Sequence, residues 1–74
     1  MAKTSTDIFR DNVRALMKEH KVSFRMLAGG LNTSAGYLSR LLSGQYDPQM
    51  SRVQQIADYF EVPLADLFQK KRRN

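Results

Sequence analysis

The sequence predicts an all-α domain of five short helices, and three observations support this prediction. Apolar residues recur every three or four positions along the chain, and no segment alternates with the period of two that is typical of strands. The breaks between the apolar stripes carry residues that commonly begin or end helices. A length of 74 residues allows one domain with a small core. We therefore expect short helices, tightly connected, around one core.

The first helix is expected from about Asp7 to His20, with Thr6 as its N-cap. Its apolar side chains fall at i, i+4, i+7 and i+8 and form one buried stripe, made of Phe9, Val13, Leu16 and Met17. Basic residues at steps of four line another face, which we interpret as solvated: Arg10, Arg14 and Lys18. His20 is interpreted as a helix C-terminal residue and not as a ligand.

The second helix is expected to start after Ser23, a typical N-cap residue. Its inward residues are Phe24, Leu27, Ala28 and Leu31. The pair Gly29-Gly30 is unusual near a helix end, because each glycine costs about 1 kcal/mol relative to alanine there. It marks either a close helix contact or fraying.

A sharp turn at Asn32-Thr33 is expected to lead into the third helix, because Asn tolerates the left-handed backbone conformation. Thr33 or Ser34 caps this helix, which reaches about Ser43 and ends at Gly44. Three leucines point inward and leave another face for solvent. The inward residues are Leu38, Leu41 and Leu42, and the outward residues are Gly36, Tyr37 and Arg40.

The fourth helix is expected to begin at Pro48, with Asp47 as its cap. Its buried stripe consists of Met50, Val53, Ile56, Ala57 and Phe60. The segment Glu61-Val62-Pro63 interrupts the pattern. A short fifth helix then packs Leu64, Leu67 and Phe68 against the core.

The net charge of +5 is unevenly distributed. The basic tail 70–73 contributes +4, whereas residues 53–69 carry three acidic groups and no basic group. Residues 21–52 have four basic groups, Lys21, Arg25, Arg40 and Arg52, against the single acid Asp47. A polyanion is therefore attracted to the middle of the chain and repelled by the segment that follows it.

Composition excludes several other classes of protein. The chain has no cysteine, so it has neither disulfides nor thiolate metal sites, and no apolar stretch approaches the roughly 20 residues of a membrane span. The N-terminus lacks the apolar core of a signal peptide, and we expect a cytoplasmic location. One histidine, no paired carboxylates and no phosphate-binding loop predict no enzyme. We expect no catalytic residues, metal, cofactor or small-molecule ligand.

The segment Ser23–Gly44 resembles the helix-turn-helix unit of the Cro/CI-type phage repressors and related regulators of the XRE family. The matching features are the cap Ser23, the inward pair Leu27-Ala28, Asn32 at the turn, the anchors Leu38 and Leu41, and Gly44 as the stop. Further matches are Pro48, Val53, Ile56, Ala57, Val62, Leu64 and Leu67-Phe68, so the likeness covers about Phe9–Phe68. Two positions depart from the family pattern. Phe24 replaces a common Gln, and Ala35 and Gly36 stand where polar base-reading side chains are usual.

The resemblance implies a five-helix, lambda-repressor-like DNA-binding domain over residues 1–69, with the helix-turn-helix at its second and third helices. Residues 70–74 form a basic tail that we expect to be disordered in the free chain. The implied function is a sequence-specific transcriptional regulator, most simply a repressor, that binds a pseudo-palindromic operator in double-stranded DNA as a homodimer. The alternative is a protein-interaction module on the same fold, such as an antitoxin, with residues 53–69 as its contact surface.

Site residues follow from the outward face of the third helix and its surroundings. We expect base reading by Ala35, Gly36, Tyr37 and Arg40, with Arg40 suited to guanine. Phosphate contacts are expected from Ser23, Arg25, Thr33, Ser34, Ser39, Gln45 and Tyr46. The expected dimer interface consists of Val62, Leu64 and Phe68. Other roles remain open: Arg40 as a solvated arginine, Tyr37 as partly core, Phe24 as core or at a DNA sugar edge, and Arg10, Arg14 and Lys18 as a DNA-contacting stripe.

Overall fold

A computed structural model describes residues 4–70, which are helical throughout apart from turns and loops. The elements are α1 (Ser5–His20), α2 (Phe24–Leu31), α3 (Ala35–Leu42), α4 (Met50–Phe60) and a 3-10 helix, η1 (Leu64–Phe68). The prediction of an all-α fold with a helix-turn-helix at its second and third helices is confirmed. The fifth element is a 3-10 helix of 5 residues, which is tighter than an α-helix.

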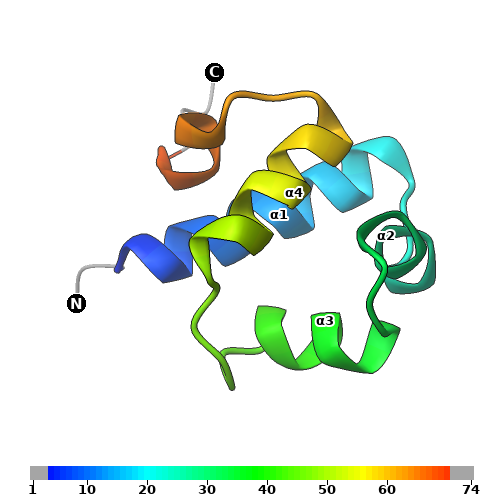
Figure 1. Ribbon diagram of the computed structural model, residues 1–74. Coiled ribbons are helices and arrows are strands. Elements are labelled where there is room, and N and C mark those ends of the chain that lie inside the picture. Colours follow the sequence, from blue (N-terminus) through cyan, green and yellow to red (C-terminus); the bar gives the residue numbers. More distant parts are fainter. Residues whose placement is uncertain (1–3, 71–74) are drawn as a thin grey trace.

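The elements are arranged so that α3 lies at one edge of the molecule. Figure 1 shows α3 along the lower edge, with η1 on the far side of α4. α2 packs on α3 and α4, and η1 packs on α1 and α4. One side of α3 therefore faces away from the other helices.

The core takes side chains from every element, as the apolar stripes predict. Its largest fully buried members are Phe9, Leu27, Leu38, Leu41, Ile56, Leu67, Val13 and Val53. Four predicted core residues are less buried, namely Phe24, Met50, Leu64 and Phe68. Met50, the first residue of α4, is 63% exposed, so its place in the buried stripe was wrong, and Phe24 is half-buried against the edge of the core.

Several predicted helix boundaries are confirmed by hydrogen bonds and dihedral angles. Ser23 caps α2 by accepting from the backbone N of Met26 at 3.1 Å, and Ser34 caps α3 by accepting from that of Tyr37 at 3.0 Å. Asn32 has the left-handed conformation at the turn, with φ of 58°. Gly44, with φ of 99°, follows the end of α3 in a conformation that favours glycine.

The start of α1 differs from the prediction. Thr4 is its N-cap, not Thr6, and the helix begins at Ser5. The hydroxyl of Thr4 accepts from the backbone N of Asp7 at 3.2 Å, and the Asp7 carboxylate accepts from the backbone N of Thr4 at 3.3 Å. This reciprocal capping box requires an acidic or amide side chain three residues after the cap. If Thr6 were the cap, the residue three positions later would be Phe9, which has no such side chain. This explains why Thr4 is the cap.

The start of α4 was also predicted too early. The helix begins at Met50 after Gln49, which makes no side-chain cap hydrogen bond, so Asp47 does not cap α4 and Pro48 precedes it. Asp47 instead lies 3.8 Å from Nη2 of Arg10, which also binds the carbonyl of Tyr46. These contacts tie the loop to α1, and Gln49 at the end of the loop has extended backbone angles.

The glycine pair in α2 has two different explanations. A Cβ at Gly30 would overlap the ring of Tyr59 on α4, whereas a Cβ at Gly29 would meet nothing within 4 Å. Gly30 therefore permits close packing of α2 on α4. Gly29 has no such role among the described residues.

Candidate nucleic-acid interface

The outward face of α3 presents the residues predicted to read bases. Gly36, Ser39 and Arg40 are exposed, whereas Ala35 and Tyr37 are half-buried at its margins. The opposite face of α3 is anchored by Leu38, Leu41 and Leu42, all of which are buried. The position of the outward face therefore follows from the burial of the leucines, as the sequence predicts.

Tyr37 is only partly available, because it lies within a stack of side chains. Its ring stacks on that of Tyr46 with centroids 5.7 Å apart and planes 20° from parallel. The guanidinium of Arg52, from α4, lies 5.3 Å from the centroid of the Tyr37 ring, within the usual range of a cation–π contact. The stack ties the surface of α3 to the loop after it and to α4.

Arg52 also fixes the end of α2. Its Nη1 donates to the carbonyl of Leu31 at 3.1 Å and to Oε1 of Gln55 at 2.9 Å. The carbonyl groups at a helix C-terminus lack intrahelical partners and carry partial negative charge, so a cation suits them. Arg52 is one of the basic residues in the middle of the chain, but its guanidinium binds other parts of the protein.

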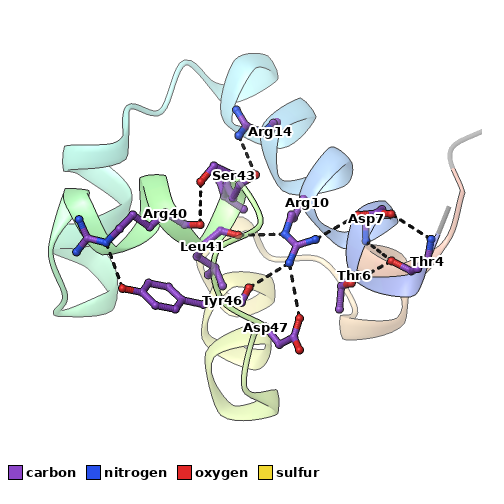
Figure 2. Close-up of polar contacts among 11 residues, drawn as sticks. Thr4, Thr6, Asp7, Arg10, Arg14, Arg40, Leu41, Ser43, Tyr46 and Asp47 are labelled. Atoms are coloured by element: carbon purple, nitrogen blue, oxygen red, sulfur yellow. Dashed lines mark hydrogen bonds and ion pairs between the residues drawn. The ribbon is translucent and has the colours of Figure 1, made fainter.

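Two arginines of α1 perform the same task at the end of α3, as Figure 2 shows. Arg10 donates from Nε to the carbonyl of Leu41 at 3.0 Å, and Arg14 donates from Nη2 to that of Leu42 at 2.8 Å. The interpretation of this face of α1 as solvated is therefore wrong for Arg10, which is half-buried. Arg14 and Lys18 are exposed, as that interpretation requires, although Arg14 also donates to the end of α3.

Arg10 has further partners that hold the loop after α3. Its Nη2 donates to the carbonyl of Tyr46 at 3.1 Å, and its Nη1 forms an ion pair with Asp7 at 3.2 Å (Figure 2). The side chain is only 12% exposed, which is low for a surface arginine. Arg10 therefore joins α1, the end of α3 and the following loop.

The predicted phosphate contacts lie mostly on the surface. Ser23, Arg25, Ser34, Ser39, Gln45 and Tyr46 are exposed, and Thr33 is half-buried. Ser23 and Ser34 accept hydrogen bonds as N-caps, and a hydroxyl that accepts one bond still has a proton to donate. Capping and phosphate binding are thus compatible at both serines.

The predicted dimer residues Val62, Leu64 and Phe68 are half-buried and pack against the edge of the core. The ring of Phe68 stacks on that of Phe9, with centroids 5.6 Å apart. His20 ends α1 as predicted, with its ring 5.6 Å from that of Phe60. In the predicted tail, residues 71–74 lie outside the described residues.

Asn12 is the buried polar side chain of the described core, and the sequence interpretation missed it. Its Nδ2 donates toward three carbonyl groups at the end of η1 and just after it. These belong to Asp66, Leu67 and Gln69, at 3.2, 2.9 and 2.8 Å. The signal was present in the sequence. Asn12 lies beside Phe9 and Val13 on the apolar face of α1, where a polar residue needs a partner.

Comparison with known proteins adds a family to this geometry. A family model described as helix-turn-helix matches residues 13–67, which include α2, the turn and α3. The chain belongs to this helix-turn-helix family. No curated protein and no solved structure gave a significant match.

Membership of the helix-turn-helix family makes this chain a DNA-binding regulator of the Cro/CI type, which is the resemblance that the segment Ser23–Gly44 indicated. The family is a regulatory one and not a family of enzymes. Within residues 4–70, no helix has the length and apolar character needed to cross a membrane.

Proposed function

We propose that this helix-turn-helix chain is a sequence-specific transcriptional repressor that inserts α3 into the major groove of a pseudo-palindromic operator. The observation that carries the proposal is the exposed outward face of α3, with Gly36 and Arg40 on it, at an edge of the molecule. The major groove, about 12 Å wide, admits a helix and displays a different pattern of donors and acceptors for each base pair. Repression follows from occlusion of polymerase at the operator.

In this proposal the base-reading residues have separate tasks. Arg40 binds guanine, Ala35 and the edge of the Tyr37 ring contact thymine methyl groups, and Gly36 allows close approach of the backbone. Phosphates on either side are held by the surface hydroxyl, amide and guanidinium groups, which belong to Ser23, Arg25, Thr33, Ser34, Ser39, Gln45 and Tyr46. These phosphate contacts set the register of α3 in the groove.

The repressor acts as a homodimer through the partly exposed apolar side chains beside η1, which are Val62, Leu64 and Phe68. A chain of 74 residues buries a small core, and a second copy adds apolar burial. Two copies related by a two-fold axis place their α3 helices in half-sites about 34–36 Å apart. We assign its site of action to the bacterial cytoplasm, where the operator DNA is. Sedimentation of the full chain at micromolar concentrations tests the dimer, and a monomer even on operator DNA would contradict it.

Selection of bound sequences from random DNA, followed by titration at several salt concentrations, tests the function. We expect a two-fold symmetric motif, a steep loss of affinity with salt, and binding to the selected site at least roughly 10³-fold tighter than to random DNA. Equal affinity for both kinds of DNA would refute specific recognition.

Arg40→Ala tests the proposed reading helix, with Lys18→Ala as the matched control. We expect R40A to weaken binding to the selected site by about 1–3 kcal/mol and to relax the preference for guanine at one position of each half-site. Lys18 is also exposed and cationic but lies on α1, so K18A should leave that preference unchanged. An R40A variant with unaltered specificity would remove Arg40 from the interface.

A further inference from the structure

The structure points to Tyr46 as a positioning residue for Arg40. We propose that the Tyr46 hydroxyl holds the guanidinium of Arg40 so that its two terminal nitrogens meet a guanine end-on. This inference rests on the proposed DNA-reading function and adds a specific residue and geometry to it.

Tyr46 is suited to this role because both its backbone and its ring are fixed. Its carbonyl accepts from Nη2 of Arg10 at 3.1 Å, and its ring stacks on Tyr37 with centroids 5.7 Å apart. Tyr37 is in turn covered by Arg52, which is hydrogen-bonded to the carbonyl of Leu31 at 3.1 Å. The hydroxyl of Tyr46 is thus held in place by contacts from α1, α3 and α4, although the residue itself lies in a loop.

The contact between Tyr46 and Arg40 uses one specific nitrogen. Nε of Arg40 donates to the Tyr46 hydroxyl oxygen at 3.2 Å, as drawn in Figure 2. The terminal nitrogens Nη1 and Nη2 have no hydrogen-bond acceptor within residues 4–70. An arginine has five N–H donors in a planar fork, so fixing Nε sets the direction of the other two nitrogens. That pair matches O6 and N7 of guanine.

The guanidinium of Arg40 lies over Gly36. A Cβ at position 36 would lie 3.4 Å from Nη1 of Arg40 and 3.8 Å from Nη2, at ordinary van der Waals distance. The guanidinium therefore lies back along α3 toward the helix N-terminus, the direction in which helical side chains lean. An arginine already held in its binding geometry loses less conformational freedom on contact with the base.

Tyr46→Phe removes the hydroxyl and keeps the aromatic stack, so it separates positioning from packing. The measurement is the affinity ratio between the selected operator and the same site with the Arg40-dependent guanine replaced by adenine. We expect Y46F to lower this ratio about fivefold, the factor that corresponds to one ordinary hydrogen bond, with the thermal midpoint almost unchanged. The control is Tyr59→Phe, because the Tyr59 ring packs on α2 beside Gly30 and its hydroxyl has no partner within residues 4–70.

A double-mutant cycle with Arg40→Ala makes the test decisive. In the R40A background, Y46F should leave the guanine-to-adenine ratio unchanged, because the group that it positions is gone. The inference is overturned if Y46F weakens binding to both sites equally, which is the result of a phosphate contact alone, or if its effect persists without Arg40. If the wild-type chain prefers no sequence, the proposed function itself fails, whereas specific binding that Y46F does not alter refutes only the role of Tyr46.

Discussion

Two segments distant in sequence are held to α1 by the same kind of bond but with different chemistry. At the end of α3, guanidinium groups of Arg10 and Arg14 donate to backbone carbonyls. At the end of η1, the neutral amide of Asn12 performs this task. A charged donor strengthens a hydrogen bond but is costly to bury, and Asn12 is only 4% exposed.

The difference teaches where this domain can use charge. The α3 joint, where Arg10 and Arg14 bind the end of α3, lies near solvent and beside the proposed DNA surface. A cation there keeps part of its hydration and adds to the attraction for phosphate. The η1 joint, where Asn12 binds the end of η1, lies within the core, where a neutral donor satisfies the carbonyl groups at lower cost. The α3 joint is shared between two side chains, whereas the η1 joint depends on one. Substitutions at the two joints should therefore differ in size and in salt dependence.

The largest effect is expected from Asn12→Asp, which keeps the shape of the side chain and removes its donor. A buried carboxylate facing three carbonyl oxygens should lower the free energy of unfolding by about 3 kcal/mol or more at neutral pH. Urea denaturation measures this loss. Gln55→Glu is the control, because it adds the same charge at an exposed position where the side chain still accepts from Arg52, and it should change stability by less than about 0.5 kcal/mol.

The next largest effect is expected from Arg10→Met at the charged joint. This change removes the side-chain donor to the carbonyls of Leu41 and Tyr46, although that of Leu41 still accepts from the backbone N of Gly44 at 3.3 Å. It should cost about 2 kcal/mol, less than the buried substitution because water can reach part of the site. Lys18→Met, on the same face of α1, should be neutral within about 0.5 kcal/mol. Equal losses for the two variants would mean that the hydrogen bonds of Arg10 do not stabilise the α3 joint.

A smaller effect on stability is expected where α2 packs closely against α4, a contact that differs in kind from both polar joints. Gly29→Ala should raise the free energy of unfolding by about 0.5–1 kcal/mol, because alanine favours the helix and the space is open. Gly30→Ala should be less stable than G29A by at least about 1 kcal/mol, because its Cβ displaces the Tyr59 ring. Thermal unfolding of the two variants checks this, and equal stabilities would show that the ring moves aside freely.

The smallest expected effect concerns salt. The penalty of Arg10→Met should shrink by about 0.5 kcal/mol between low salt and about 1 M NaCl, since salt screens the interaction of the cation with the carbonyls and with Asp7. The penalty of Asn12→Ala, which involves no charge, should stay constant over the same range. A parallel salt response of both penalties would contradict the assignment of different chemistry to the two joints.

Local rules predicted most of the fold. The caps Ser23 and Ser34, the left-handed Asn32 and the inward leucines of α3 all follow from residue type and spacing, because each depends on neighbours within a few positions. The outward direction of Arg40 follows from the same leucines. The joints were not predicted. Asn12 on the apolar face of α1 signalled a polar residue that needs a partner, but the partners of Asn12 and Arg10 are backbone carbonyl groups, which every residue carries and which the sequence therefore does not single out.

The surroundings of the candidate site were predicted less well than its helix. Tyr37 was placed on the surface of α3, but its stack with Tyr46 and Arg52 depends on how the loop after α3 folds back. That loop is drawn toward α1 by Arg10, a contact across 36 positions. The surroundings of Tyr37 therefore depend on a contact between residues far apart in the sequence, which local patterns do not reveal.

The donors Arg10 and Asn12 both lie in the first half of α1, and this limits how far the domain can be shortened from its N-terminus. The segment matched by the family model begins at residue 13, after Arg10 and Asn12. A fragment excised at that boundary would retain the whole helix-turn-helix sequence but lose the side-chain donors to the carbonyls of Leu41 and Leu67. A fragment that keeps both donors must extend back at least to Arg10, beyond the part by which the family is recognised.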